Sequence, residues 1–153
     1  MDELYKKARL KALSLLTDMD RTEAQLRSKL LQKEYPTEVV EDAISYVKSF
    51  GYINDVNYAK RFVEYRKANK SKREIYAALT QKGLEKDVIE AALEECYGSD
   101  DAIETIQRLV QKKHFSTEYS TEEEKKKICN YLLRKGFHYE DIRKVLQVSS
   151  WNA

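Results

Sequence analysis

Residues 74–93 read EIYAALTQKGLEKDVIEAAL, and this stretch decides the fold. Its apolar residues include two pairs that are each four residues apart, Ile75 with Leu79 and Ile89 with Leu93. Because apolar residues at this interval line one face of an α-helix, the stretch predicts two amphipathic helices. Gly83 stands between them, where glycine enters left-handed backbone at little cost and ends a helix.

The same spacing of apolar residues, which we call the frame, occurs twice more in the chain. Its three copies consist of Leu26, Leu30, Lys33, Val40 and Ile44, then Ile75, Leu79, Lys82, Ile89 and Leu93, then Ile128, Leu132, Lys135, Ile142 and Leu146. In every copy the apolar positions follow the first at offsets of four, fourteen and eighteen residues, and lysine follows at seven. The copies begin 49 and then 53 residues apart, which indicates a tandem repeat.

Composition favours helices along the whole chain. Only one Pro and four Gly occur among 153 residues, while 35% are charged, as in sequences of long helices. We therefore predict an all-α protein of three tandem three-helix repeats that form an elongated, curved right-handed or solenoid-like stack. Residues 1–153 are expected to form a single domain, with repeat units at about 1–50, 51–98 and 99–153.

Helix starts are marked by capping boxes, in which a hydroxyl residue is followed three positions later by Glu or Gln. These pairs are Thr22 with Gln25, Ser71 with Glu74 and Thr121 with Glu124. After the linker at residues 51–55, either Asn54 or Asp55 can cap the next helix. Residues 114–120 are predicted to be a loop, and residues 149–153 a frayed end.

The first copy of the frame departs from the others at one position. Glu34 stands where the second and third copies have Gly83 and Gly136. We expect the first turn to be built differently for this reason, with Pro36 providing part of the chain break.

Cysteine usage and hydropathy bear on the compartment. Cys96 and Cys129 are isolated and form no C-x-x-C motif, as expected of free structural thiols in a reducing environment. No segment approaches the roughly 20 apolar residues of a membrane span, and no apolar run follows the charged N-terminus. We therefore expect a cytoplasmic protein with no membrane association.

A search for catalytic chemistry finds no candidate site. His114 and His138 are far apart in sequence and lack Cys, Asp or Glu at metal-ligand spacing. The acidic pair Asp100 and Asp101 lies at a helix start, where capping explains it. Residues 51–55 contain one glycine and no phosphate-binding pattern. The sequence therefore predicts no catalytic residue, no metal site and no cofactor.

The basic residues are concentrated locally although the net charge is only +2. Five cations fall within eight residues, at Arg66, Lys67, Lys70, Lys72 and Arg73. This run is either a solvated charged surface or an electrostatic contact for phosphates or an acidic protein.

Two further features have alternative explanations. The lysine of each repeat, Lys82 in the middle copy, either stabilises the negative end of a helix dipole or contacts a partner. Most of the 11 tyrosines lie near helix ends and are expected to pack there. Tyr58 and Tyr65 border the basic run, so base stacking stays open for them.

Residues 51–66, GYINDVNYAKRFVEYR, resemble the signature of the bacterial RecX recombination regulators. The matching residues are Gly51, Tyr52, Asp55, Tyr58, Ala59, Phe62, Val63 and Arg66. The following KSKREIYAALTQKG, which ends at Gly83, resembles the middle unit of that family, and the resemblance extends over nearly the whole chain.

The resemblance implies a modulator of the RecA recombinase that acts in DNA recombination, DNA repair and the SOS response. Members of the family bind in the groove of the RecA–single-stranded DNA filament and limit its growth, ATP hydrolysis and strand exchange. We expect a monomeric regulator. Because the sequence has no convergent His, Cys or carboxylate groups, we expect that it is not an enzyme. The alternative is a helical repeat protein that binds single- or double-stranded nucleic acid directly, without a recombinase.

From the basic run and the family resemblance together, we predict a contact surface for the filament and its DNA. It comprises Arg66, Lys67, Lys70, Lys72 and Arg73, with Lys82 and Tyr65 as further members. The other signature residues, among them Asp55, Tyr58, Phe62 and Gly83, are interpreted as capping, turn and packing residues.

Overall fold

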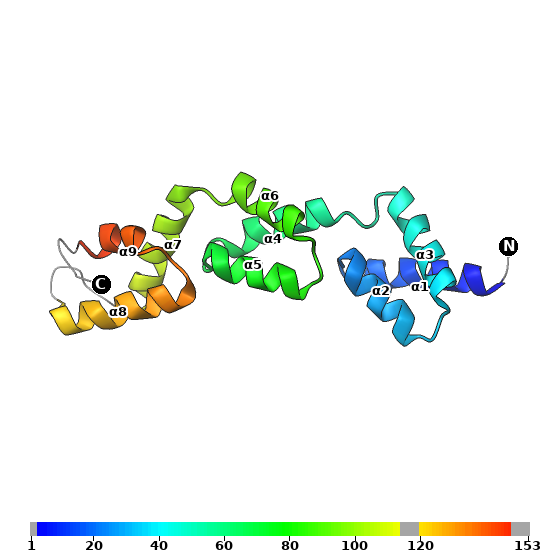
Figure 1. The fold of residues 1–153 in the computed structure, drawn as a ribbon, viewed down its shortest axis with the longest axis horizontal. Helices are drawn as coiled ribbons and strands as arrows, with labels where there is room; N and C mark the ends of the chain where they lie inside the picture. Colours follow the sequence, from blue (N-terminus) through cyan, green and yellow to red (C-terminus); the bar gives the residue numbers. More distant parts are fainter. Residues whose placement is uncertain (1–2, 114–119, 148–153) are drawn as a thin grey trace. The chain divides into compact units, whose positions relative to one another are not determined.

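The computed structural model describes residues 3–113 and 120–147, and every regular element in these ranges is a helix (Figure 1). This confirms the all-α class and the three-helix repeats. The predictions for residues 114–119 and 149–153 lie outside the described residues. The helices are α1 (Glu3–Asp18), α2 (Glu23–Gln32), α3 (Thr37–Ser49), α4 (Asp55–Arg66), α5 (Lys72–Gln81), α6 (Lys86–Cys96), α7 (Ser99–Lys112), α8 (Glu122–Lys135) and α9 (Tyr139–Leu146).

All apolar positions of the repeated frame are buried. Leu93 is the most exposed of them, at 8%. The frame therefore marks the inward face of the second and third helix of each repeat, as its period requires.

By its internal contacts the chain forms two compact bodies. The first contains Met1–Arg61 and Leu79–Ile89, and the second contains Phe62–Ala78 and Glu90–Ala153. Each body holds one terminal repeat and part of the middle repeat, because the division passes through α4, α5 and α6.

Each terminal repeat has its own hydrophobic core. In the first body α1 packs on α3, and buried residues such as Ala12, Leu30 and Val40 fill the space between α1, α2 and α3. In the second body α7 packs on α9, and Ile106, Leu132 and Ile142 occupy the corresponding core.

The predicted caps are present. The hydroxyls of Thr22, Ser71 and Thr121 each accept a hydrogen bond from the backbone N–H three residues on, and the Gln or Glu there accepts one in return. Of the two candidates after the linker, Asn54 caps α4 by accepting from the Asn57 N–H. Asp55 accepts instead from the Glu23 N–H, at the start of α2 in the preceding repeat.

The turn after α2 corrects one expectation. Glu34 has a left-handed backbone with φ of +65°, like Gly83 at +84° and Gly136 at +106°. Its N–H bonds to the carbonyl three residues back, as it does in both glycine turns. The first turn therefore shares its left-handed backbone with the others but differs at the next residue. The N–H groups of Leu84 and Phe137 bond to the carbonyls five residues back, whereas that of Tyr35 makes no such bond, and Pro36 then stands at the N-cap of α3. The expectation of a different turn is wrong for the backbone conformation of Glu34 and correct for this bond. Glu34 itself is exposed to solvent.

Adjacent repeats are joined at these turns. The buried hydroxyl of Thr22 donates to the carbonyl of Lys82, and that of Ser71 donates to the carbonyl of Lys135. Each cap hydroxyl therefore binds two helices, its own N-terminus and the C-terminal turn of a helix in the next repeat. The bond from Thr22 lies within the first compact body, and the bond from Ser71 lies within the second.

Glycine is required where the turns fit against the preceding repeat. A Cβ on Gly83 would lie 2.4 Å from the Cβ of Ala24, and one on Gly136 would lie 2.7 Å from the Nε of Arg73. Close approach, in addition to left-handed backbone, explains these two glycines.

Candidate partner-contact surface

The basic run lies where the chain passes from α4 to α5. α4 ends at Arg66, and the N–H groups of Asn69 and Lys70 both return to the Arg66 carbonyl. Ser71 then caps α5. A short hydrogen-bonded turn between two helices therefore positions the cations that the sequence analysis selected.

Arg66 and Tyr65 are the outward-facing members at the end of α4. The side chain of Tyr65 is 78% exposed. The Arg66 guanidinium carbon lies 5.4 Å from the ring centres of both Phe62 and Tyr65. These cation–π contacts hold the guanidinium against aromatic surface while its charge stays accessible.

Lys67 is engaged within the protein. Its ammonium donates to the Cys96 carbonyl at 3.1 Å and lies 3.2 Å from Glu64 and 3.5 Å from Asp101. Burial lowers the pKa of Lys67, but the bond to Glu64 and the charge of Asp101 outweigh it and raise the pKa. The lysine therefore stays charged, and two carboxylates neutralise that charge locally.

Lys70 and Lys72 lie on either side of the Ser71 cap, beside Tyr97. The Tyr97 hydroxyl donates to the Lys70 carbonyl at 2.8 Å, and the Lys72 ammonium is 5.7 Å from the Tyr97 ring centre. Burial raises the pKa of Tyr97 to about 12, so its hydroxyl keeps its proton. The backbone of the turn is anchored, while the Lys72 side chain is exposed.

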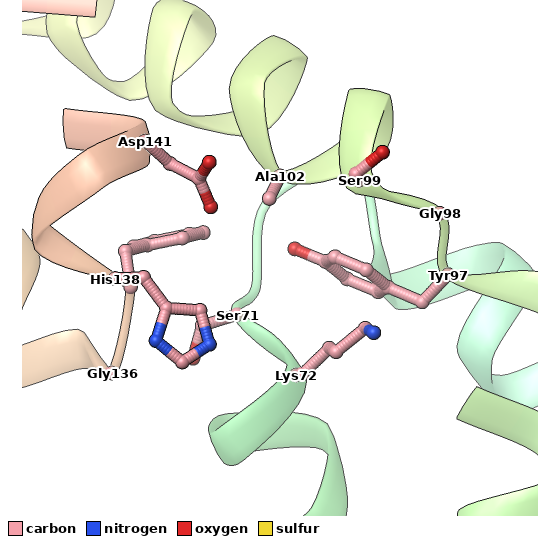
Figure 2. Close-up of a pocket in the computed structure, with 10 residues that line it drawn as sticks. Ser71, Lys72, Tyr97, Gly98, Ser99, Ala102, Gly136, His138 and Asp141 are labelled. Carbon is pink, nitrogen blue, oxygen red and sulfur yellow. The ribbon is translucent and has the colours of Figure 1, made fainter. Parts of the chain in front are cut away.

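A cavity of about 170 Å³ opens beside Lys72 (Figure 2). The side chains of Lys72, Tyr97, His138 and Asp141 surround it, and α5, α7 and α9 all begin at its edge. Two of the N–H groups at these helix starts are bonded within their own caps, that of Ser71 to the Glu74 carboxylate at 2.9 Å and that of Gly98 to the Asp101 carboxylate at 2.7 Å.

Arg73 and Lys82 take part in the joins between repeats. The Arg73 guanidinium donates to the Arg134 carbonyl, and its side chain packs against Gly136. Lys82 follows the end of α5, and its carbonyl accepts from Thr22. Lys82 belongs to the first compact body, whereas the basic run from Arg66 to Arg73 belongs to the second.

The other signature residues differ in their exposure. Ala59 and Val63 are buried, and Tyr58 and Phe62 are half-buried. Gly51 is exposed and has left-handed backbone.

Tyr52 is 53% exposed, and its ring stacks on that of Phe50 at 5.5 Å between ring centres. Its ring therefore lies largely outside the core, against a second exposed aromatic side chain.

Two residues that the sequence analysis missed hold the basic turn in place. Thr105 donates to the Lys67 carbonyl, and Arg108 donates to the Ala68 carbonyl at 2.8 Å. Thr105 is fully buried beside Ile106 on α7. The sequence shows a hydroxyl residue beside the apolar stripe of a helix. It does not show which group this hydroxyl binds, because the partner lies 38 residues away.

Within the described ranges, no group of three or more His, Cys, Asp or Glu side chains is arranged to hold a metal ion. Cys129 is buried, Cys96 is half-buried, and neither is in a disulfide; burial raises the pKa of Cys129. Among the helices described, none is long and apolar enough to cross a membrane.

Family models for the three successive three-helix domains of RecX match residues 8–46, 54–93 and 99–146. The chain belongs to the RecX family. The resemblance seen at residues 51–66 is therefore confirmed, and the three RecX domains follow one another in the order of the repeats.

Curated relatives carry the name Regulatory protein RecX. The RecX of Caldanaerobacter subterraneus subsp. tengcongensis is 37% identical over 145 residues, which cover 94% of this chain and 71% of that protein. The RecX of Trichlorobacter lovleyi is 30% identical over 142 residues, covering 90% of this chain and 92% of that one. The family is thus one of regulatory proteins.

Solved RecX structures share the fold. The crystal structure of RecX from Lactobacillus salivarius matches with a TM-score of 0.84 and 26% identity, covering 96% of this chain and 97% of that chain. A second RecX crystal structure matches with a TM-score of 0.80, covering 95% of this chain and 72% of that one; at 23% identity it supports the fold alone.

Proposed function

We propose that this RecX-family protein regulates the RecA–single-stranded DNA filament and inhibits its recombinase activity. The observation that carries the proposal is its likeness, over nearly the whole chain, to proteins named Regulatory protein RecX. The regulator acts as a monomer in the cytoplasm, during recombination, repair and the SOS response. It needs no cofactor and catalyses no reaction.

The proposed contact surface is the basic run with its two further members. In the second compact body it comprises Tyr65, Arg66, Lys67, Lys70, Lys72 and Arg73, and Lys82 is a separate candidate contact in the first body. Cations on a hydrogen-bonded turn suit an acidic protein surface or DNA phosphates, because the backbone that carries them is already ordered.

Arg66, Lys70 and Lys72 are the members to test first. Lys67 and Arg73 bond to other segments of the protein, so replacing them would disturb the fold as well as the charge. Arg66 and Lys72 are exposed, and Lys70 is half-buried.

The function is tested by following ATP hydrolysis by the cognate RecA on single-stranded DNA while this protein is titrated. Inhibition at ratios well below one protein per DNA site is expected, because a regulator that stops filament growth has to bind only a few sites on each filament. Inhibition only at saturating ratios, matched by tight binding to bare DNA, would instead indicate simple competition for the strand.

The surface is tested with the triple variant Arg66→Ala, Lys70→Ala, Lys72→Ala. Filament inhibition should weaken by at least tenfold while the unfolding midpoint stays nearly unchanged. The matched control replaces Lys6, Lys7 and Lys33, three exposed lysines of the first repeat, and removes the same charge. Equal inhibition by both triple variants would contradict the assignment.

A further inference from the structure

The third repeat contains a second basic groove, separate from the run in the middle repeat. It is an open cavity of about 500 Å³ along α8 and the end of α7, within the size range of ligand-binding clefts. Its lining residues are Lys113, Glu124, Lys127, Ile128, Asn130, Tyr131 and Arg134.

The groove has a defined geometry along α8. Lys127, Asn130, Tyr131 and Arg134 follow one another at intervals of three, one and three residues, so they form one stripe of the helix. Lys127 and Arg134 are seven residues apart, about 10 Å along the helix axis. Lys113 faces this stripe from the end of α7, with its ammonium 4.1 Å from the Tyr131 ring centre.

The charge of the groove is positive. Its three cations, Lys113, Lys127 and Arg134, are exposed. Its one carboxylate, Glu124, accepts from the N–H of Thr121 at 3.1 Å and from its hydroxyl at 3.0 Å, as part of the α8 cap. An anion in the groove therefore meets three cations and one carboxylate, whose Oε1 is held by the helix cap.

Comparison among the repeats shows that the fold does not require these side chains. The middle repeat has Glu74, Ala77, Ala78 and Gln81 at the positions of Lys127, Asn130, Tyr131 and Arg134, and the first repeat has Gln25, Ser28, Lys29 and Gln32. Both repeats form the corresponding helix without a tyrosine at the position of Tyr131 and without cations at the positions of Lys127 and Arg134. The groove chemistry is thus particular to the third repeat.

We propose that this groove binds single-stranded DNA. Lys113, Lys127 and Arg134 contact successive phosphates. In the free protein the ammonium groups of Lys113 and Lys135 lie 4.1 Å and 5.8 Å from the Tyr131 ring centre. When Lys113 moves from the ring to a phosphate, it exposes aromatic surface to an unstacked base. The Asn130 amide both donates and accepts at a base edge.

A single strand suits the groove better than a duplex or an acidic protein. Base faces are covered in a duplex, whereas a single strand can use every kind of group in the groove: the cations on its phosphates, the ring on a base face and the amide on a base edge. The choice of DNA as the strand rests on the proposed function.

The test uses bare oligodeoxythymidine, with no recombinase present, and follows fluorescence anisotropy across salt concentrations. The groove variant Lys113→Ala, Lys127→Ala, Arg134→Ala should bind at least tenfold more weakly at low salt. Its log–log salt slope should be smaller by about 2, because each single-strand phosphate contact contributes about 0.7. The Lys6, Lys7, Lys33 triple variant serves as the charge-matched control.

Tyr131→Leu separates stacking from charge. It should weaken binding about tenfold with an unchanged salt slope, since the phosphate contacts remain. Its unfolding midpoint is measured alongside, because Tyr131 is half-buried.

Three results would overturn the proposal: no binding of the bare strand by the intact protein, equal losses in both triple variants, or unchanged binding by the groove variant. Loss of filament inhibition with unchanged binding to bare DNA would instead assign the groove to an acidic protein surface. None of these outcomes removes inhibition of RecA by the intact protein, so the groove can fail while the proposed function stands.

Discussion

The residue type at the turn after the second helix of each repeat depends on whether a preceding repeat packs against that turn. Gly83 and Gly136 leave no room for a side chain, because Ala24 and Arg73 of the preceding repeats lie against them. Glu34 adopts the same left-handed backbone with its side chain in solvent. One backbone geometry thus accepts a large side chain in the first repeat and excludes even a methyl group in the others.

We predict that Gly83→Ala destabilises the protein by about 2–4 kcal/mol, from left-handed strain plus overpacking against Ala24. Gly51→Ala is the matched control, because Gly51 also has left-handed backbone, with φ of +75°, but no atom lies within 4 Å of the added Cβ. It should lose only about 1 kcal/mol. Urea unfolding of the two variants checks the difference, and equal losses would contradict the close contact.

At the scale of helices, N-terminal caps also serve as connections between repeats. Thr22 and Ser71 are buried and donate to carbonyls 60 and 64 residues away, whereas Thr121 is exposed and bonds within its own cap. Lys82 is half-buried. A carbonyl that loses its donor at a partly buried position adds a desolvation cost to the lost bond, because water reaches it poorly.

Thr22→Val should therefore cost about 2–3 kcal/mol of unfolding free energy, combining the lost cap of α2 with the unsatisfied Lys82 carbonyl. Thr121→Val removes a cap alone and should cost about 1 kcal/mol. Denaturant titration of both variants measures the difference. If Thr22→Val proved no more costly than Thr121→Val, the bond between repeats would contribute nothing measurable.

At the scale of the whole molecule, the middle repeat is shared between two compact bodies. Residues 62–78 belong with the last repeat, and residues 79–89 belong with the first. Repeat proteins of this kind gain their stability from neighbouring units rather than from each unit alone.

We therefore predict that residues 51–98 in isolation lose most of their helicity and unfold without a cooperative transition. A segment of this length is marginal alone, and its residues are divided between the two compact bodies. Residues 1–98, which keep the first core and the bond from Thr22 to Lys82, should retain cooperative unfolding. Far-UV circular dichroism in urea distinguishes the two fragments, and a cooperative transition in 51–98 would refute the prediction.

The amino-acid sequence by itself determined the helices, their inward faces and their caps. These depend on neighbours within one or two helical turns, so the frame of Ile75 and Leu79 and the cap at Ser71 could be recognised locally. The RecX signature could be recognised in the same way, as a pattern along one stretch.

Only the tertiary structure decided what the polar groups do. Three contacts depend on residues that the fold brings together from distant parts of the sequence. They are the ion pair of Lys67 with Asp101, the bond from Arg73 to a carbonyl of α8, and the contact of Lys113 with the Tyr131 ring. Hydrogen bonds and charges act over a few ångströms in space, and sequence spacing does not encode those distances for separate helices. Local periodicity therefore predicted the repeats, and packing assigned their surfaces.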